Sequence, residues 1–173
     1  MTTEPSQLEA QGKRAFANKK FDEAANLFRE AAETYTLAHE TVLAAEMMNN
    51  VSVALLQAGK PEESLASVTG TEMVFEEAKD TKRQAMAFGN KAAALEALNR
   101  TDEAIAAYEL SAELFKQVGE GDLRAMVMKS AAALKLKTGK VTESAFKMMG
   151  SLEAKENPGF FERILRYLLR FIK

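Results

Sequence analysis

The chain has 173 residues, of which 47% are hydrophobic and 28% are charged, a composition typical of one globular domain and too apolar for a disordered chain. Its net charge of -2 argues against a nucleic-acid-binding domain, which usually carries a basic excess. It has no cysteine and one histidine, which excludes disulfides, thiolate nucleophiles and metal sites rich in cysteine or histidine. We therefore expect no cofactor.

Helix-forming residues dominate the chain, and runs that alternate β-branched or aromatic residues with polar ones are missing. The pattern predicts a series of helices joined by very short turns, so that consecutive helices form antiparallel hairpins. In chain order the predicted helices cover residues 6–18, 21–38, 40–58, 61–78, 81–98, 101–118, 121–138 and 141–155.

One pattern returns every 40 residues, at 20–24, 60–64, 100–104 and 140–144, and reads basic, variable, polar, Glu, small. An apolar residue follows each copy, and small residues align where helices must approach closely. The aligned residues are Phe28, Val68, Tyr108 and Met148, then Ala45, Ala85 and Ala125, then Ala54, Ala94 and Leu134. One hairpin cannot bury its own apolar face, so we expect an all-α, right-handed solenoid of four stacked helix-turn-helix repeats.

The residues of the first copy resemble a tetratricopeptide repeat. The matching residues are Gly12, Phe16, Phe21, Ala24, Phe28 and Ala31. Later copies match more loosely, since Ser64 and Ser144 stand where the family usually has alanine and the period of 40 exceeds the family's 34. The resemblance covers residues 6 to about 155 and is similar to the long-helix variants of the family.

The resemblance implies a concave groove, lined by the first helix of each hairpin, that binds a peptide or a helix. The lining residues in this register are Glu9, Lys13, Glu46, Asn49, Asn50, Val53, Met86, Gly89, Asn90, Ala93, Met126 and Lys129. Family members that bind chaperones hold two carboxylates with Lys, Asn and Arg, and only Asn50 agrees with that set. We therefore expect a helix or an extended apolar peptide in the groove, with Asn49 and Ala93 facing open space.

The chain carries no recognisable catalytic motif, and we expect no enzymatic activity. His39, beside Glu40, is interpreted as a solvated turn histidine in preference to a general base. The repeated glutamates at 23, 63, 103 and 143 are interpreted as first-turn carboxylates favoured by the helix dipole, because stacked repeats hold them about 10 Å apart.

A distinct segment follows Asn157-Pro158-Gly159, so we expect a repeat domain over residues 1–156 and a C-terminal amphipathic helix over 157–173. Its polar arc holds Glu162, Arg163, Arg166, Arg170 and Lys173, with a net charge of +3. Its apolar residues are Phe160, Phe161, Ile164, Leu165, Tyr167, Leu168, Leu169, Phe171 and Ile172. A helix of about 21 Å is too short to span a bilayer, yet so many apolar side chains must be buried.

Three burial sites compete for this helix: an anionic membrane surface, the exposed end of the protein's own solenoid, and a partner or second copy. We expect a non-catalytic, cytoplasmic scaffold or adaptor that binds a protein segment, with the membrane as a second contact under the first hypothesis. The alternative is a soluble self-associating module whose tail caps the solenoid or fills its own or another copy's groove. No secretory signal and no run of 18 apolar residues is found in the sequence.

Overall fold

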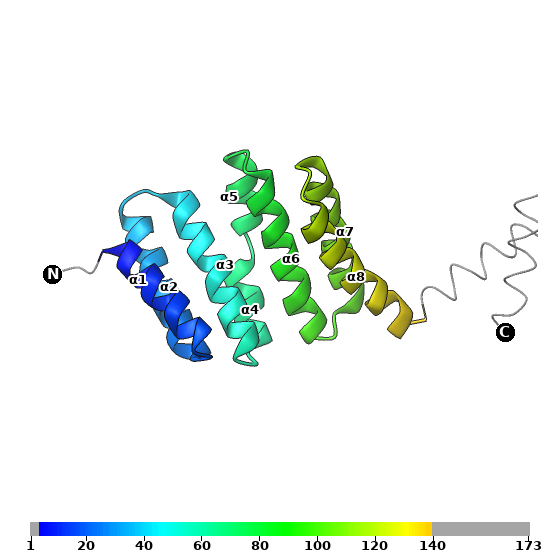
Figure 1. The fold of residues 1–173 in the computed structure, drawn as a ribbon, viewed down its shortest axis with the longest axis horizontal. Coiled ribbons are helices and arrows are strands. Elements are labelled where there is room, and N and C mark those ends of the chain that lie inside the picture. The colour runs from blue at the N-terminus through cyan, green and yellow to red at the C-terminus, as the bar shows by residue number, and fades with distance from the viewer. Residues whose placement is uncertain (1–3, 140–173) are drawn as a thin grey trace, which may run out of the picture. The chain divides into compact units, whose positions relative to one another are not determined.

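The computed structural model describes residues 4–139, which form helices and turns and no strand. The helices are α1 (Pro5–Ala17), α2 (Phe21–Leu37), α3 (Thr41–Gln57), α4 (Pro61–Val68), α5 (Thr71–Glu77), α6 (Thr81–Ala97), α7 (Thr101–Gln117) and α8 (Gly121–Lys137) (Figure 1). Residues up to Ala131 form one compact unit, and a second unit begins at Ala132, within α8. The all-helical class and most predicted helix bounds, within one or two residues, are confirmed.

The turns that end every described helix except α4 place a left-handed residue every 20 positions. The backbone is left-handed, with positive φ, at residues 19, 39, 59, 79, 99, 119 and 139. In the first turn the N–H of Lys20 donates to the carbonyl of Ala15 and the N–H of Lys19 donates to that of Phe16, both at 2.9 Å. This pair of bonds is a Schellman motif, which closes the helix and reverses the chain within three residues. Each hairpin is therefore set by local backbone chemistry.

The prediction of one helix over 61–78 is wrong, because the chain breaks between α4 and α5. Thr69 is extended, with ψ of 124°, and Gly70 is left-handed, with φ of 93°. The N–H of Gly70 donates to Oε2 of Glu72 at 2.8 Å, and Nζ of Lys91 on α6 donates to Oε1 of the same carboxylate at 2.8 Å. Burial raises the pKa of Glu72, but the hydrogen bonds from Lys91 and backbone N–H groups outweigh it and hold this pKa below its ordinary value. Glu72 thus connects the backbone at the break to Lys91 on α6.

The helices pack in chain order: α1 on α2, α2 on α3, α3 on α4, α5 and α6, and α6 on α4, α5 and α7 (Figure 1). The aligned apolar residues Phe28, Val68 and Tyr108 are 3%, 0% and 6% exposed, which confirms them as core. The aligned small residues Ala54 and Ala94 have no exposed surface, as expected where helices approach closely. The repeat of 40 therefore predicts burial at these positions but not at Ala125, which is exposed although the aligned Ala45 and Ala85 are buried. The predicted helix over 141–155 lies outside the described residues.

Candidate functional site

A hollow of about 170 Å³ opens between α1, α2 and α3. Its lining residues are Lys13, Phe16, Phe28, Asn50 and Val53. The aromatic rings and the valine make it mainly apolar, while the lysine and the asparagine supply the polar groups. The register read from the sequence predicted Lys13, Asn50 and Val53 as lining, and the structure places these three around one hollow.

A glycine on α1 shapes the buried side of this hollow. A Cβ atom at Gly12 would lie 2.7 Å from Cε1 and 2.8 Å from Cδ1 of Phe28. Because carbon atoms normally approach to about 3.5–4.0 Å, only glycine lets the Phe28 ring lie this close to α1. Phe28 is 3% exposed, so its ring has little freedom to move away. The position of one wall of the hollow therefore depends on the absence of a side chain at residue 12.

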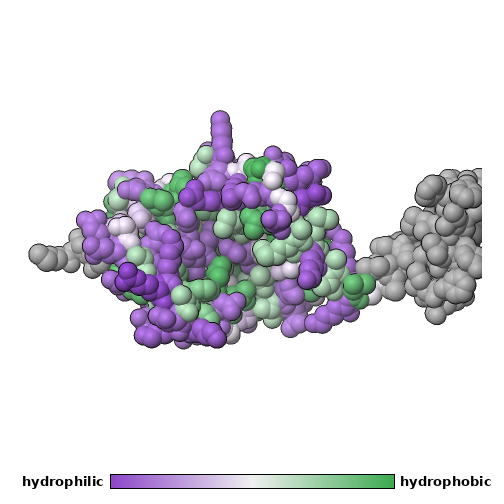
Figure 2. All heavy atoms as spheres, viewed as in Figure 1, coloured by the Kyte–Doolittle hydropathy of each residue, from purple (hydrophilic) through white to green (hydrophobic). Residues whose placement is uncertain are grey.

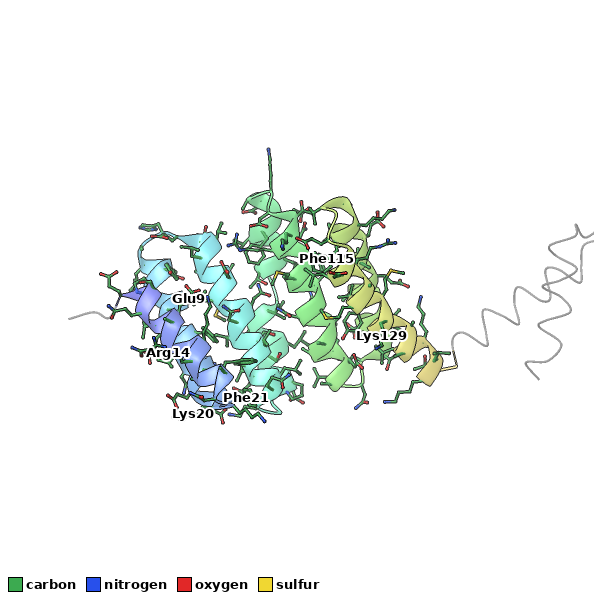
Figure 3. All side chains as sticks on the ribbon, in the orientation of Figure 1. Glu9, Arg14, Lys20, Phe21, Phe115 and Lys129 are labelled. Atoms are coloured by element: carbon green, nitrogen blue, oxygen red, sulfur yellow. The ribbon has the colours of Figure 1, made fainter. Side chains whose placement is uncertain are left out.

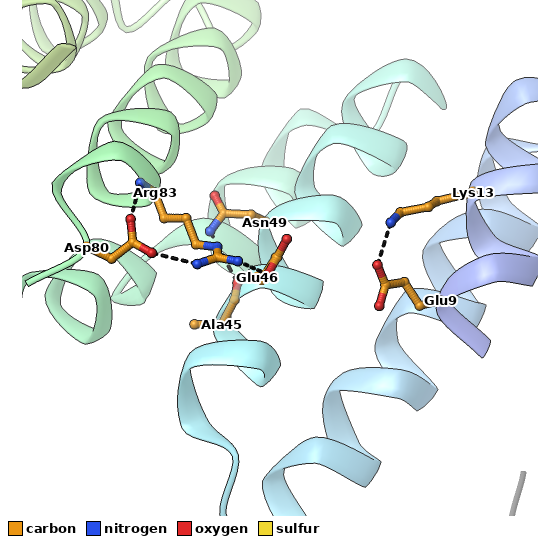
Figure 4. Close-up of polar contacts among 7 residues, drawn as sticks. All are labelled: Glu9, Lys13, Ala45, Glu46, Asn49, Asp80 and Arg83. Carbon is orange, nitrogen blue, oxygen red and sulfur yellow. Dashed lines mark hydrogen bonds and ion pairs between the residues drawn. The ribbon is translucent and has the colours of Figure 1, made fainter. Parts of the chain in front are cut away.

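The charged side chains on this face are paired with one another (Figure 4). Nζ of Lys13 lies 2.5 Å from Oε1 of Glu9, and this hydrogen bond raises the pKa of Lys13. Arg83 on α6 pairs with Glu46 on α3 at 2.9 Å and with Asp80 at 2.6 Å. Carboxylates of the protein therefore already pair with Lys13 and Arg83, which disfavours a clamp for a charged peptide terminus at these two residues.

The same carboxylate at Asp80 also caps α6. Its Oδ1 accepts the N–H of Arg83 at 3.0 Å. Burial raises the pKa of Asp80, but the hydrogen bonds from the backbone and guanidinium of Arg83 outweigh it, so this pKa lies below its ordinary value. Together with Glu46, the pair links the start of α6 to α3.

The expectation that Asn49 faces open space is wrong, because this side chain is 7% exposed. Its Nδ2 donates to the carbonyl of Ala45 at 3.2 Å and to Oγ1 of Thr71 at 3.1 Å, and its Oδ1 accepts from Nδ2 of Asn90 at 3.1 Å. These bonds join α3 to α5 and to α6. Asn49 and Asn90 therefore hold helices together, and Thr71 is a partner that the sequence pattern did not reveal.

The remaining predicted lining residues lie outside the hollow. Met86 and Met126 are 46% and 60% exposed, Lys129 is exposed, and Ala93 is half-buried. Figure 3 shows Glu9 on α1 and Lys129 on α8. Hydrophilic residues cover most of the described surface in the view of Figure 2, with small separate hydrophobic patches. The structure thus gathers part of the predicted set around one hollow and leaves the rest elsewhere on α1, α3, α6 and α8.

One feature of the hairpins, a buried contact between two serines, was missed in the sequence. Ser64, which replaces the usual alanine, is fully buried, and its Oγ lies 2.9 Å from Oγ of Ser52 and donates to the carbonyl of Ser52 at 2.8 Å. The available signal was that both serines occur in the same repeat, where the first repeat has Gly12 and Ala24. Paired replacements of this kind indicate a contact between two helices.

The histidine and the repeated glutamates that were interpreted as non-catalytic lie at exposed positions where the structure describes them. His39 is exposed, with φ of 60°, in a helix-ending turn. Glu23 and Glu103 are exposed and form ion pairs with the basic residue that begins their own repeat pattern, Lys20 at 3.0 Å and Arg100 at 2.6 Å. Across residues 4–139, no three acidic or histidine side chains are grouped so that they could hold a metal ion.

No model of a known protein family matches this chain, and no curated protein matches its sequence. Within the described range, no helix combines the length and apolar character that crossing a membrane requires. The predicted amphipathic C-terminal helix, with its basic and apolar residues and its boundary at 156, lies outside the described residues.

Proposed function

We propose that this protein is a non-catalytic scaffold or adaptor that binds a helix or an extended apolar peptide along the face of its first helices. We further propose that its hairpins form a right-handed, tetratricopeptide-like solenoid. The observation that carries the binding proposal is the hollow between α1 and α3, whose lining includes Lys13, Asn50 and Val53. These residues were expected at a binding groove from the resemblance to the tetratricopeptide repeat.

The size and walls of the hollow favour an apolar anchor from the partner. A buried apolar cavity of about 150 Å³ is large enough to hold benzene, so a hollow of about 170 Å³ fits one phenyl or branched aliphatic side chain. Phe16, Phe28 and Val53 supply apolar contact, and Asn50 supplies an amide for the partner's backbone. Because Lys13 is already paired with Glu9, a partner carboxylate would have to displace an existing ion pair.

The spacing of the turns supports the solenoid proposal. Left-handed residues that recur every 20 positions give each hairpin nearly the same length and turn. Units of equal geometry that contact mainly their sequence neighbours stack into a superhelix. Contacts from α1 through to α7 follow this neighbour order within the unit that ends at Ala131.

A peptide-display selection tests the binding proposal. Peptides selected on the full-length protein should share one large apolar residue and should lose at least about tenfold in affinity for Val53→Arg, which places a charge in the hollow. Val53→Leu is the conservative variant, and Leu110→Arg, at a 52% exposed position on α7, is the matched surface control. Both should bind normally, and all three variants should be folded by circular dichroism.

Two results would contradict the proposal. Equal peptide affinity of folded Val53→Arg and wild type would show that the hollow is not the binding site. Loss of binding in Leu110→Arg with retention in Val53→Arg would place the site on the second helices. Light scattering of the protein alone tests the alternative of a self-associating module, for which we would expect a concentration-dependent mass that falls in Val53→Arg.

A further inference from the structure

The face that contains the hollow continues across α6 onto α8 (Figure 1). The hollow joins α1 to α3, and Nδ2 of Asn90 on α6 donates to Oδ1 of Asn49 on α3 at 3.1 Å. A Cβ atom at Gly89 on α6 would lie 3.7 Å from Cγ1 of Val127 on α8, so these two helices also approach closely. All of these contacts lie within the unit that ends at Ala131. The four first helices are therefore neighbours in one layer.

Two exposed methionines occupy the same repeat position on α6 and α8. Met86 and Met126 are 40 residues apart, and they are 46% and 60% exposed. Met126 directly precedes Val127, and Met86 lies one turn before Gly89, the residue that lets the two helices approach. Because α6 and α8 are neighbours that run in the same direction, equal positions on them lie opposite each other. We call these two residues the methionine pair.

A lysine beside the methionine pair has no ion pair among residues 4–139. Lys129 is exposed and stands three residues after Met126, on the same side of α8 (Figure 3). By contrast, Lys13, Lys82 and Arg83 on the neighbouring first helices each pair with a carboxylate of the protein. A carboxylate from a partner can therefore pair with Lys129 without displacing an existing ion pair.

Two asparagines at equal repeat positions lie between the hollow and the methionine pair. Asn50 lines the hollow, and Asn90 is half-buried on α6. The amide nitrogen of Asn90 is used by Asn49, whereas its Oδ1 has no hydrogen-bond partner among the described residues. An extended peptide needs partners for its backbone N–H and C=O groups, whereas a helix satisfies most of them internally. The two amides therefore favour an extended peptide over a helix.

The distance between the hollow and the methionine pair sets the spacing of the peptide's anchors. Packed helix axes lie about 8–10 Å apart, and the two places are centred about two helix spacings from each other. Met86 also precedes Ala93, the repeat equivalent of Val53, by seven residues, which is about 10 Å along the helix. The two places are thus about 20 Å apart. An extended peptide covers this distance in about six residues and a helix in about 13.

We propose that the methionine pair and Lys129 form a second subsite for the same extended peptide whose apolar anchor enters the hollow. The subsite takes an aromatic side chain, because methionine sulfur makes favourable contacts with aromatic rings and its flexible chain adapts to their shape. Lys129 takes a carboxylate next to that ring. This inference rests on the proposed function, since it assigns the first anchor to the hollow. The partner is an extended segment with two apolar anchors about six positions apart and an acidic residue beside the second.

Synthetic peptides test the spacing on the full-length protein. Each probe carries a leucine and a phenylalanine–aspartate pair in a background of serine and glycine, in both orders and at varied separations, and fluorescence anisotropy measures binding. Affinity should be highest when leucine and phenylalanine stand about six positions apart. At that separation it should exceed the affinity of the peptide without phenylalanine at least about fivefold. Highest affinity at about 13 positions would overturn the extended form in favour of a helix.

Variants of two methionines on α8 locate the second anchor. Met126→Ser should lower the affinity for the two-anchor peptide at least about threefold and leave the peptide without phenylalanine unaffected. Met128→Ser is the matched control, because Met128 is 48% exposed on the same helix but lies about 200° around its axis from Met126. This control should bind both peptides like wild type. Both variants should be folded by circular dichroism.

A change at Lys129 tests the carboxylate. Lys129→Gln should weaken binding of the aspartate peptide about two- to fivefold, the range of an exposed ion pair, and should not affect the matching asparagine peptide. Added salt should shrink the difference between the two peptides in wild type. Equal effects of Lys129→Gln on both peptides would overturn the assignment of the carboxylate to this lysine.

The variants also separate this inference from the proposed function. Wild-type binding by folded Met126→Ser, with binding lost in Val53→Arg, would reject the second subsite and leave the hollow as the binding site. Wild-type binding in both variants would reject both proposals. A concentration-dependent mass in light scattering that falls in Met126→Ser would assign the methionine pair to a second copy of the chain and overturn the peptide subsite.

Discussion

Replacing Gly12 by alanine should destabilise the fold, although alanine is the better helix former. The new Cβ would lie 2.7–3.1 Å from three ring atoms of Phe28, against a normal carbon contact of about 3.5–4.0 Å. The ring or α1 must therefore move by several tenths of an ångström inside a packed core. Overpacking of this kind costs about 1–3 kcal/mol, and the gain in helix propensity returns about 0.5–1 kcal/mol. We expect a net loss of up to about 2.5 kcal/mol in the free energy of unfolding.

Gly89→Ala is the matched control, since Gly89 also lies in the middle of a helix. Its Cβ would lie 3.4 Å from Oγ of Ser111 and 3.7 Å from Cγ1 of Val127, which are ordinary contacts. This variant should therefore gain about 0.5–1 kcal/mol from helix propensity. Urea unfolding followed by circular dichroism at 222 nm measures both changes. A stabilised Gly12→Ala protein would refute the close contact between α1 and Phe28.

The remaining predictions concern the turns, the buried amide network and one carboxylate. Lys79→Gly should stabilise the fold by about 0.5–1 kcal/mol because it relieves a left-handed lysine, and Gly59→Lys should destabilise it by a similar amount; thermal unfolding of both variants checks the pair. Asn49→Ala should cost about 1–3 kcal/mol in urea unfolding because it leaves buried partners unsatisfied, whereas Asn50→Ala should stay within about 0.5 kcal/mol; equal effects would contradict the network. Because the pKa of Glu72 is lowered in the folded state, its ionised form stabilises the fold above about pH 4.5 and this contribution is lost as the pH falls further; Glu72→Gln should cost about 1 kcal/mol at pH 7, and the difference from wild type should shrink below pH 4.5.

The helix bounds could be predicted from the sequence because they depend on local chemistry. Each turn needs a left-handed residue and each helix needs one apolar face, and both signals repeat at fixed spacing along the chain. The break at Gly70 was missed because its repeat equivalents are Glu30 and Leu110, which continue their helices. A glycine inside a helical pattern is compatible with either outcome, and the tertiary anchor from Glu72 to Lys91 decides it here.

The candidate site could be predicted only in part, because the sequence pattern reports local structure and not the contacts between hairpins. A register places residues on a face, which was sufficient for Lys13, Asn50 and Val53. It does not show how deeply a side chain lies, and the burial of Asn49 depends on Thr71, which is 22 residues away in the sequence. Interactions between residues this far apart arise from packing between hairpins. The periodicity within one helix carries no information about that packing.

The most direct test of the binding account is a methyl NMR titration of the full-length protein with a display-selected apolar peptide. If the first helices form the binding face, the methyl signals of Val53 and of the exposed Met86 should shift as peptide is added. The signals of Met73, which is 61% exposed on α5, and of Val118 after α7 should stay in place. Shifts confined to Met73 and Val118, with Val53 unmoved, would contradict the claim that the first helices form the binding face.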